Sequence, residues 1–487
     1  MLTLINTNRM RPAIAPIGLD YVAGAARDAG IKTEVVDLCL AENPDEALRG
    51  HFQRHTPALV GLSIRNVDDS FWPSAQCFLP AVKRLVADVR RLTDAPIVLG
   101  GVGFSVFAER IVAWTGAEYG IRGDGEAALA ALYRRLADRR PPGYIAGLLG
   151  RTFSNRPAWD ANDNALRVPT RRDAVDNAAY FRVGGQIGLE TKRGCPAACD
   201  FCADTLAKGA AARLRPAADV ADEAEALLRQ GVDVLHLCDG EFNVPYAHAR
   251  AVCAEFIARG LGSRLRWYTY MAVPPFDAAL AEAMRRAGCA GINFTGPAAT
   301  DTMLRAYGQR HHARDLAASV RAARDAGITV MVDMMFGGPG ETPQTVRAAV
   351  EFLKQIGPDC VGAALGVRLY AELPMTRRIV ALSGPLDTNP GVWRRYEGPV
   401  DLLWPTYFIS PALGERPAAV IRDAIAGDQR FFEPADEPEA GPDAGGAGAK
   451  DHNYNANTWL VRAIAAGARG AYWDILRKRR GDSEGAP

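Results

Sequence analysis

Three cysteines lie close together in one short stretch of the sequence, TKRGCPAACDFCADT (Thr191–Thr205). They are Cys195, Cys199 and Cys202, whereas the other six of the nine cysteines are scattered along the chain. A structural zinc ion normally takes four protein ligands, but an iron–sulfur cluster held by three cysteines keeps one iron free to bind another molecule. The loop therefore indicates a reactive iron–sulfur centre. A zinc site completed by Cys238 and a metal-free loop are the alternatives.

The residues around this loop alternate between short apolar strands and helical patterns from Gly185 onwards. The expected strands are QIGLET, VLHLCD, RWYTYM, GINFT, TVMVDMMF and CVGAALGVRLY. This alternation predicts a partial or full parallel β/α barrel over residues 185–375, with its chemistry at the carboxyl ends of the strands. Cys195 falls just after the first of these strands.

Further polar residues and glycines come at or near the ends of the expected strands. For each polar residue, a structural role explains the position as readily as a ligand contact does. The turn FGGPGET (Phe336–Thr342) would also serve as the capped start of a helix, with Thr342 as the cap. The expected ligand-binding residues of the barrel are Gly240, Glu241, Tyr270, Asn293, Gly337, Gly338 and Arg368.

Residues 1–140 show their own alternation of strands and helices, which predicts an α/β domain with a doubly wound, Rossmann-like parallel sheet. Ligands of such sheets bind at the carboxyl ends of the strands, and glycines there let a bulky ligand approach the backbone. Plain turn chemistry is the alternative explanation of these glycines. The expected ligand-binding residues of this sheet are Asn8, Arg65, Asn66, Gly100, Gly101, Gly103, Phe104 and Ser105.

Two segments lack this rhythm. Residues 141–184 are expected to connect the two domains. The C-terminal region, residues 376–487, is expected to be small and mostly helical, with a flexible low-complexity segment at 433–451. One or two helices then begin near Asn457, and we expect them to pack on or near the mouth of the active site. Trp459 and Trp473 are the expected packing anchors of these helices.

The composition limits the kinds of partner. The formal net charge is +1, so no overall field favours nucleic acid or an anionic membrane. The N-terminus lacks the features of a secretory signal, and no apolar run reaches the ~20 residues needed to cross a bilayer. We therefore expect a cytoplasmic protein with reduced thiols. Its expected partner is a small-molecule or peptide substrate, not nucleic acid or a membrane.

The motif CxxxCxxC, with Phe201 directly before the last cysteine and the first barrel strand before it, resembles that of the radical S-adenosylmethionine superfamily. The resemblance implies that Cys195, Cys199 and Cys202 hold a 4Fe-4S cluster whose free iron chelates S-adenosylmethionine. An electron donor such as flavodoxin or ferredoxin would drive cleavage of the sulfonium to a 5′-deoxyadenosyl radical. Glu241 would bind the methionyl ammonium, for which a carboxylate is a suitable partner. FGGPGET would lie near the adenosyl group.

A doubly wound domain before such a barrel resembles the cobalamin-binding subfamily of these enzymes, the class B methyltransferase-like proteins. The likeness rests on PIGLDYVAGAARDAG, the IRN loop and VLGGVGFS, and it implies that the chain binds cobalamin. The DxHxxG motif, by which other cobalamin proteins supply a histidine to cobalt, is absent from the sequence. The resemblance therefore implies no histidine ligand from this domain. Arg65 would lie near the lower cobalt face, and the Gly100–Ser105 loop would lie beside the nucleotide tail.

The reaction implied by this subfamily is methylation of an unactivated carbon in a small-molecule or peptide natural-product intermediate, through methylcobalamin and a 5′-deoxyadenosyl radical. Three alternatives stay open. An enzyme of the same build can catalyse a non-methylating rearrangement, ring contraction or cyclisation. The first domain can instead be a scaffold that has lost its cofactor. The whole chain can also be a zinc-binding interaction protein, which would leave Glu241 and FGGPGET without a role.

Overall fold

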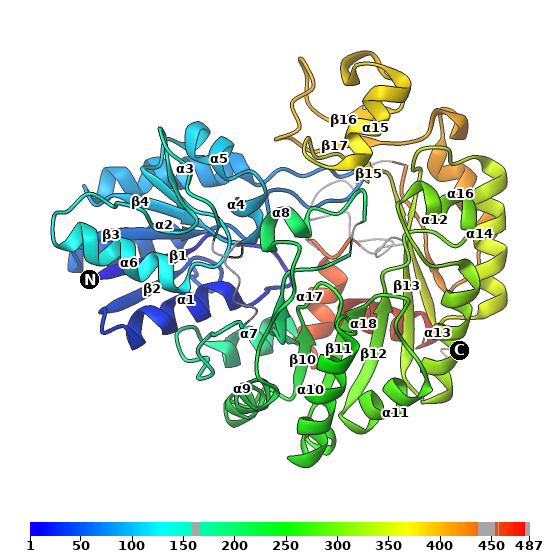
Figure 1. The fold of residues 1–487 in the computed structure, drawn as a ribbon, viewed down its shortest axis with the longest axis horizontal. Helices are drawn as coiled ribbons and strands as arrows, with labels where there is room; N and C mark the ends of the chain where they lie inside the picture. Colours follow the sequence, from blue (N-terminus) through cyan, green and yellow to red (C-terminus); the bar gives the residue numbers. More distant parts are fainter. Residues whose placement is uncertain (158, 160–164, 198, 437–452, 456, 483–487) are drawn as a thin grey trace. The chain divides into compact units, whose positions relative to one another are not determined.

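The computed structural model describes residues 1–157, 159, 165–197, 199–436, 453–455 and 457–482 (Figure 1). The chain divides into two compact units. Unit 1 consists of Met1–Asp68, Cys77–Pro196 and Asp204–Val232. Unit 2 consists of Asp69–Gln76, Ala197–Ala203 and Asp233–Pro487. The cysteine loop is thus divided between them, and the predicted domain bounds stay predictions.

The core of unit 1 is a six-stranded sheet in the order β2-β1-β3-β4-β5-β6. Neighbouring strands from β2 to β5 run parallel, and β6 runs antiparallel to β5. Because β1, β3 and β4 are direct neighbours, the loops after them meet at one edge of the sheet. The strands are β1 (Leu2–Asn6), β2 (Thr33–Asp37), β3 (Leu59–Ser63), β4 (Ile97–Gly100), β5 (Tyr119–Ile121) and β6 (Leu148–Gly150).

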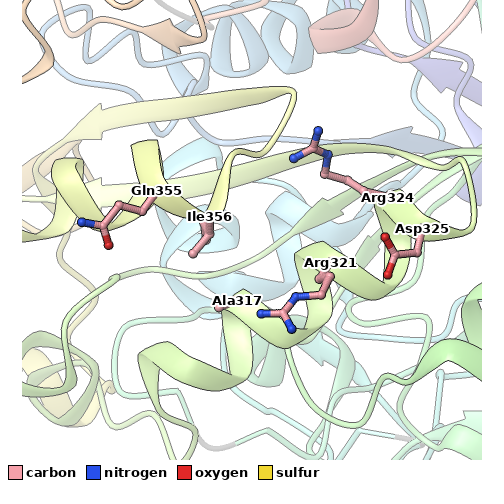
Figure 2. A pocket seen from close by; sticks show the side chains of 6 residues that line it. All are labelled: Ala317, Arg321, Arg324, Asp325, Gln355 and Ile356. Atoms are coloured by element: carbon pink, nitrogen blue, oxygen red, sulfur yellow. The ribbon is translucent and has the colours of Figure 1, made fainter.

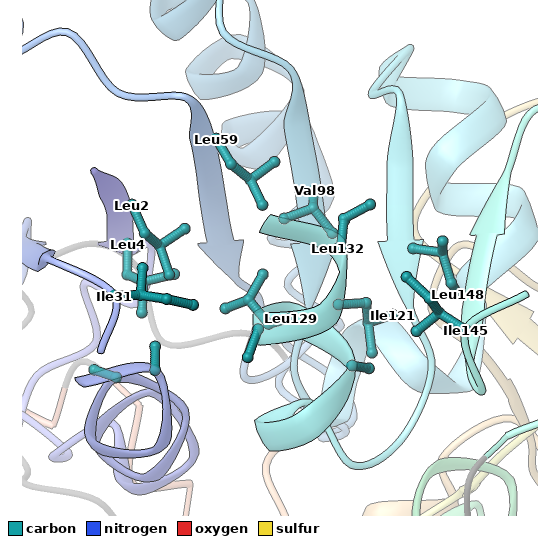
Figure 3. Close-up of a cluster of buried hydrophobic side chains, with 14 of the residues drawn as sticks. Leu2, Leu4, Ile31, Leu59, Val98, Ile121, Leu129, Leu132, Ile145 and Leu148 are labelled. Atoms are coloured by element: carbon teal, nitrogen blue, oxygen red, sulfur yellow. The ribbon is translucent and has the colours of Figure 1, made fainter. Parts of the chain in front are cut away.

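Helices cover this sheet with their apolar faces. In Figure 3, Leu129 and Leu132 of α6 lie over the sheet among the buried side chains of Val98 and Ile121. The doubly wound α/β fold predicted for the N-terminal domain is confirmed. The helices are α1 (Ile17–Asp28), α2 (Pro44–Arg54), α3 (Leu79–Leu92), α4 (Val102–Val106), α5 (Ala108–Thr115) and α6 (Glu126–Ala137).

Unit 1 also buries a group of polar and charged side chains, here called the Arg172 cluster. The Nε of Arg172 donates to Asp20 Oδ2 at 2.7 Å, and its Nη1 donates to Glu223 Oε1 at 2.7 Å. Burial alone would lower the pKa of Arg172, but the charges around it, Glu223 first, raise the pKa overall. Arg172 therefore stays charged inside the fold. The cluster consists of Asp20, Tyr21, Arg172, Asn177, Arg215 and Glu223.

The sheet strands of unit 2 run parallel in the order β18-β14-β13-β12-β11-β10. Phe294 of β12 packs against Phe276 next to α11, with ring centroids 5.5 Å apart. Since side chains alternate along a strand, the neighbouring Asn293 points to the opposite face, here called the inner face. The strands are β10 (Val234–Leu237), β11 (Arg266–Met271), β12 (Cys289–Phe294), β13 (Thr329–Phe336), β14 (Cys360–Leu365) and β18 (Phe431–Phe432).

Helices follow the strands of unit 2 in turn and cover the outer face (Figure 1). The predicted partial parallel β/α barrel is confirmed. None of the described helices is long and apolar enough to cross a membrane. The helices are α10 (Tyr246–Ala258), α11 (Ala278–Arg286), α12 (Asp301–Ala306), α13 (Ala313–Asp325), α14 (Pro343–Ile356) and α16 (Pro417–Ile425).

Besides the helices α15 (Pro374–Ser383), α17 (Thr458–Ala465) and α18 (Tyr472–Asp482), the structure contains a small sheet that the sequence analysis did not predict, in which two strands of the C-terminal region pair with Val367–Arg368 of the last expected barrel strand. Its three strands are antiparallel, in the order β15-β17-β16. Strands of two or three residues are too short to show an alternating pattern. Of the segment predicted to be flexible, residues 437–451 lie outside the described residues. The strands are β15 (Val367–Arg368), β16 (Val392–Arg394) and β17 (Thr406–Phe408).

The terminal helices begin where predicted, because the Asn457 side chain caps α17. Trp473 and Asp474 of α18 are buried. Asp474 Oδ2 accepts the Tyr268 hydroxyl at 2.9 Å, and a Cβ at Gly291 would lie 2.8 Å from the Trp473 ring. Both contacts fall in the first halves of β11 and β12, so the expected position near the active-site mouth is wrong for α18. The reason for this position is steric, because Gly291 has no side chain and leaves room beside β12 for the indole ring of Trp473.

Candidate active site

The carboxyl edge of the unit 1 sheet brings the loops after β3 and β4 into direct contact. Gly101 has a φ of +106°, and a Cβ there would lie 2.4 Å from the carbonyl oxygen of Ile64. A Cβ at Gly103 would lie 2.8 Å from the carbonyl oxygen of Arg65, which accepts the Gly103 N–H at 2.9 Å. Only glycine fits both positions. Two predicted residues, Arg65 and Asn66, are therefore held against the glycine loop.

The loop after β1 adds a buried amide to this edge. Asn8 is 9% exposed, and its Oδ1 accepts the Met10 N–H at 3.2 Å. Its Nδ2 is buried and has no hydrogen-bond partner among the described residues. The Arg65 guanidinium lies beside the same loop, with Nη1 3.7 Å from Met10 Sδ. A buried donor without a partner is expected to meet a ligand, so the edge fits cobalamin, whose amide carbonyls are acceptors.

Two other predicted residues of this edge serve the fold itself. Phe104 is fully buried, and a Cβ at Gly120 would lie 2.2 Å from its ring. The Ser105 hydroxyl donates to the Gly101 carbonyl at 2.9 Å and accepts the Gly123 N–H at 3.0 Å. Their side chains therefore pack and brace the loop, and a cofactor contact from either stays a prediction. The remaining predicted residue, Gly100, ends β4 and is half-buried.

The cysteine loop follows β8 (Lys192–Arg193). Cys195 is 8% exposed in unit 1. In unit 2, the Cys202 N–H donates to the Cys199 carbonyl oxygen at 3.4 Å. None of the three cysteines forms a disulfide bond. No three His, Cys, Asp or Glu side chains of the described residues are arranged to hold a metal ion. The fit to a cluster rests on the donor set, three thiols of one loop that form no disulfide.

Glu241 lies beyond the end of β10, on the inner face of unit 2. Its Oε1 accepts the Thr295 hydroxyl at 2.5 Å, so the carboxylate is oriented from the end of β12. Gly240, directly before it, is half-buried. The Tyr270 ring lies 5.2 Å from the His236 ring, measured between centroids. The sequence analysis did not identify His236, because a single histidine in a strand has no distinguishing pattern.

Asn293 joins this group from β12. It is 1% exposed, and its Nδ2 donates to Asp333 Oδ2 at 2.7 Å. Its Oδ1 is buried and has no hydrogen-bond partner among the described residues. The sequence analysis missed Asp333, although an acidic residue inside the apolar strand TVMVDMMF was a usable signal. We refer to Glu241, Tyr270, Asn293, Thr295 and Asp333 as the inner-face group.

The turn FGGPGET follows β13 and begins α14, and the capped helix start expected as its structural role is present. Glu341 closes the turn, because its carboxylate accepts the Gly337 N–H at 3.1 Å and the Thr345 hydroxyl at 2.8 Å. Burial raises the pKa of Glu341 to about 7, although both hydrogen bonds lower it. A Cβ at Gly338 would lie 2.3 Å from the Tyr307 hydroxyl. Gly337 has a φ of +93°, so the fold itself explains both predicted glycines, and contact with a ligand stays a prediction.

Arg368 was predicted to bind a ligand, but its guanidinium is occupied within the fold. Nη1 donates to the Leu369 carbonyl at 2.6 Å, and Nη2 donates to the Leu402 carbonyl at 3.1 Å. The group also lies 4.9 Å from the centroid of the Tyr370 ring. Arg368 therefore fixes the chain between β15 and β17, and a role in ligand binding stays a prediction.

A cavity of about 500 Å³ lies between the carboxyl ends of α13 and α14 (Figure 2). In a β/α unit the helix runs back against its strand, so these ends lie toward the amino edge of the sheet. The cavity is therefore separate from the inner-face group. It is lined by Ala317, Arg321, Arg324, Asp325, Gln355 and Ile356.

The chain thus combines a doubly wound α/β domain, a three-cysteine loop and a partial parallel β/α barrel, and comparison with known proteins identifies this combination as that of cobalamin-binding radical enzymes. The family model of the Radical SAM superfamily matches residues 189–353, and that of the B12 binding domain matches residues 5–133. The chain is 30% identical to "Tryptophan 2-C-methyltransferase" of Streptomyces laurentii, over 100% of this chain and 97% of the relative.

Solved structures give the same result. The radical S-adenosylmethionine methyltransferase TsrM from Kitasatospora setae, solved with tryptophan and aza-SAM bound, superposes with a TM-score of 0.90. It is 30% identical, and the match covers 99% of this chain and 98% of TsrM. The cobalamin-dependent enzyme OxsB superposes with a TM-score of 0.68 at 14% identity, over 84% of this chain and 64% of OxsB, which shows the fold alone.

This chain therefore belongs to the cobalamin-binding radical S-adenosylmethionine enzyme family. The predicted family, α/β architecture and cofactor set, a 4Fe-4S cluster, S-adenosylmethionine and cobalamin, are confirmed.

Proposed function

We propose that the protein is a C-methyltransferase that moves a methyl group from S-adenosylmethionine to a carbon atom of a small aromatic amino acid. Tryptophan is the first candidate substrate. The observation that carries this proposal is the 30% identity, over the whole chain, to a tryptophan 2-C-methyltransferase. A cytoplasmic location and an electron donor such as flavodoxin or ferredoxin are part of the proposal.

When bound, cobalamin supplies a methyl carrier, and the 4Fe-4S cluster supplies an iron for S-adenosylmethionine and an electron. Cys195, Cys199 and Cys202 would hold the cluster. Glu241, oriented by the Thr295 hydroxyl at 2.5 Å, would accept hydrogen bonds from the methionyl ammonium. The ammonium would then have a fixed anionic partner beyond the end of β10.

At the edge of unit 1, the Asn8 Nδ2 would donate to an amide carbonyl of cobalamin, since it has no partner among the described residues. Gly101 and Gly103 would keep the loops after β3 and β4 packed together beside the cofactor. Arg65, beside the loop that carries Asn8, would add a positive charge to the site that holds the cofactor. The sequence has no DxHxxG histidine to ligate cobalt.

The inner-face group would receive the parts of the cosubstrate and substrate that carry N–H or O–H groups. The buried Asn293 Oδ1 is an acceptor without a partner among the described residues. The Asp333 carboxylate, 2.7 Å from Asn293 Nδ2, adds negative charge beside it. An amino group, or two neighbouring ribose hydroxyls, would donate to both acceptors.

The test is anaerobic reconstitution with iron, sulfide and cobalamin, followed by turnover with tryptophan and mass spectrometry. Methylated tryptophan together with S-adenosylhomocysteine supports the proposal. If 5′-deoxyadenosine forms in an amount comparable to that of S-adenosylhomocysteine, a hydrogen atom is removed from an unactivated carbon. Its absence indicates an acceptor carbon that is itself nucleophilic, such as C2 of an indole. 5′-Deoxyadenosine with a rearranged, unmethylated product contradicts the proposal and favours the non-methylating alternative.

A further inference from the structure

A short segment after α12 lies directly against the second half of the cysteine loop. The Gln309 Nε2 lies 3.2 Å from the Cys199 Sγ, within hydrogen-bond distance for a sulfur acceptor. The Asp200 N–H donates to the Tyr307 carbonyl at 3.4 Å. The Phe201 ring meets the Tyr307 ring edge to face, with centroids 5.4 Å apart. Three successive residues of the loop are thus contacted by this segment, all within unit 2.

Helix α15 holds this segment and the cysteine loop together. Arg378 Nη1 donates to Asp200 Oδ2 at 2.5 Å, and Nη2 of the same guanidinium donates to the Ala306 carbonyl. The Asp200 carbonyl accepts the Met375 N–H at 3.1 Å. At Gly308, φ is +72°, and a Cβ there would lie 2.7 Å from Asp200 Oδ1. These contacts fix the segment that carries Gln309, so its amide is held next to Cys199.

We propose that Gln309 is a positioning residue that donates a hydrogen bond to the Cys199 sulfur and thereby raises the reduction potential of the cluster. This inference rests on the proposed role of Cys199 as a cluster ligand. Reduction adds an electron to the cluster and increases the negative charge on its sulfur ligands. An N–H donor stabilises that charge and favours the reduced form, and hydrogen bonds to the sulfurs are one of the means by which proteins set such potentials. Because an amide does not titrate, the effect of Gln309 is independent of pH.

The test is a redox titration of the reconstituted, cobalamin-free full-length protein, followed by electron paramagnetic resonance of the reduced cluster. Iron and acid-labile sulfide are measured first in each variant. Q309L keeps most of the side-chain volume but removes the donor. We expect about a tenfold smaller equilibrium constant for reduction, which for a one-electron couple is a potential about 59 mV lower. Q355L is the matched control, because Gln355 is exposed at the end of α14, at the cavity of Figure 2.

Q309E keeps the size of the side chain. It is the variant to titrate if Q309L does not assemble a cluster. Its carboxylate removes the donor and adds negative charge, so we expect a potential at least as low as that of Q309L. Potentials of Q309L or Q309E equal to those of Q355L and the unmodified protein would overturn the inference but leave the proposed function intact. An unmodified protein that takes up neither iron nor sulfide would overturn both.

Discussion

The Arg172 cluster of unit 1 and the inner-face group of unit 2 both bury polar and charged side chains, but they differ in what satisfies them. Each of the three guanidinium nitrogens of Arg172 donates to a protein oxygen, on Asp20, Glu223, Gly188 or Asn177. In the inner-face group, the buried Oδ1 of Asn293 has no partner among the described residues. Buried polar atoms in native proteins are normally hydrogen-bonded. The first region is therefore scaffold, and the second is where we expect a ligand to bind.

The largest effect is expected from breaking the scaffold. R172M leaves Asp20 buried without its cation and leaves Glu223 with Arg215 alone, and we expect a loss of about 3–5 kcal/mol in the free energy of unfolding. The matched control is R171M. Arg171 is 52% exposed and pairs with Asp28 on the surface, so its loss should cost less than about 1 kcal/mol. Urea denaturation measures the unfolding free energy of both variants. Equal losses in R172M and R171M would show that the Arg172 cluster is not a scaffold.

Glu341 provides a pH test of the turn after β13. Burial raises its pKa from the ordinary value of 4.5 to about 7 in the folded chain. Because the folded chain favours the protonated carboxyl group, the contribution of Glu341 to stability is fully present below about pH 4.5. It is lost as the pH rises through about 7. The protein should lose about 2.5 kcal/mol of unfolding free energy between pH 5 and pH 8 relative to E341Q, at most 1.36 kcal/mol per pH unit. Parallel stability curves for the two proteins would contradict this.

Asn293 tests the other side of the comparison. N293A removes the buried acceptor, and we expect about tenfold weaker binding of S-adenosylmethionine or tryptophan, in the range of a lost hydrogen bond to a charged or buried group. Its cost in unfolding free energy should stay below that of R172M. Anaerobic calorimetry gives the affinity, and denaturation gives the stability. A variant as unstable as R172M with unchanged affinities would show that the inner face is scaffold too.

The smallest expected effect concerns the orientation of Glu241. T295V is nearly isosteric and removes only the hydroxyl that donates to the carboxylate at 2.5 Å. We expect the KM for S-adenosylmethionine to rise about fivefold, the equivalent of about 1 kcal/mol, with kcat little changed. Steady-state kinetics separate the two constants. A fall in kcat at constant KM would instead place Thr295 in the chemical step.

The sequence was informative where chemistry or periodicity is local. Three cysteines in one loop and six strand–helix alternations predicted the cluster loop and the barrel, because both depend on neighbouring residues. The contacts of Arg172 with Asp20 and Glu223 could not be predicted, since they join residues 152 and 51 positions apart. For the same reason Gln309, 110 residues from Cys199, escaped notice. Arg368 shows the converse, because its position at a strand end did not reveal that neighbouring carbonyls occupy it.

The most direct measurement of the central claim is the iron and acid-labile sulfide content of the anaerobically reconstituted protein. We predict about four of each per chain, as a 4Fe-4S cluster requires. C199A should lose the cluster. C253A, at a buried thiol of α10 outside the motif, should keep it. An unmodified protein without iron and sulfide, or a C199A variant that retains both in full, would contradict the account.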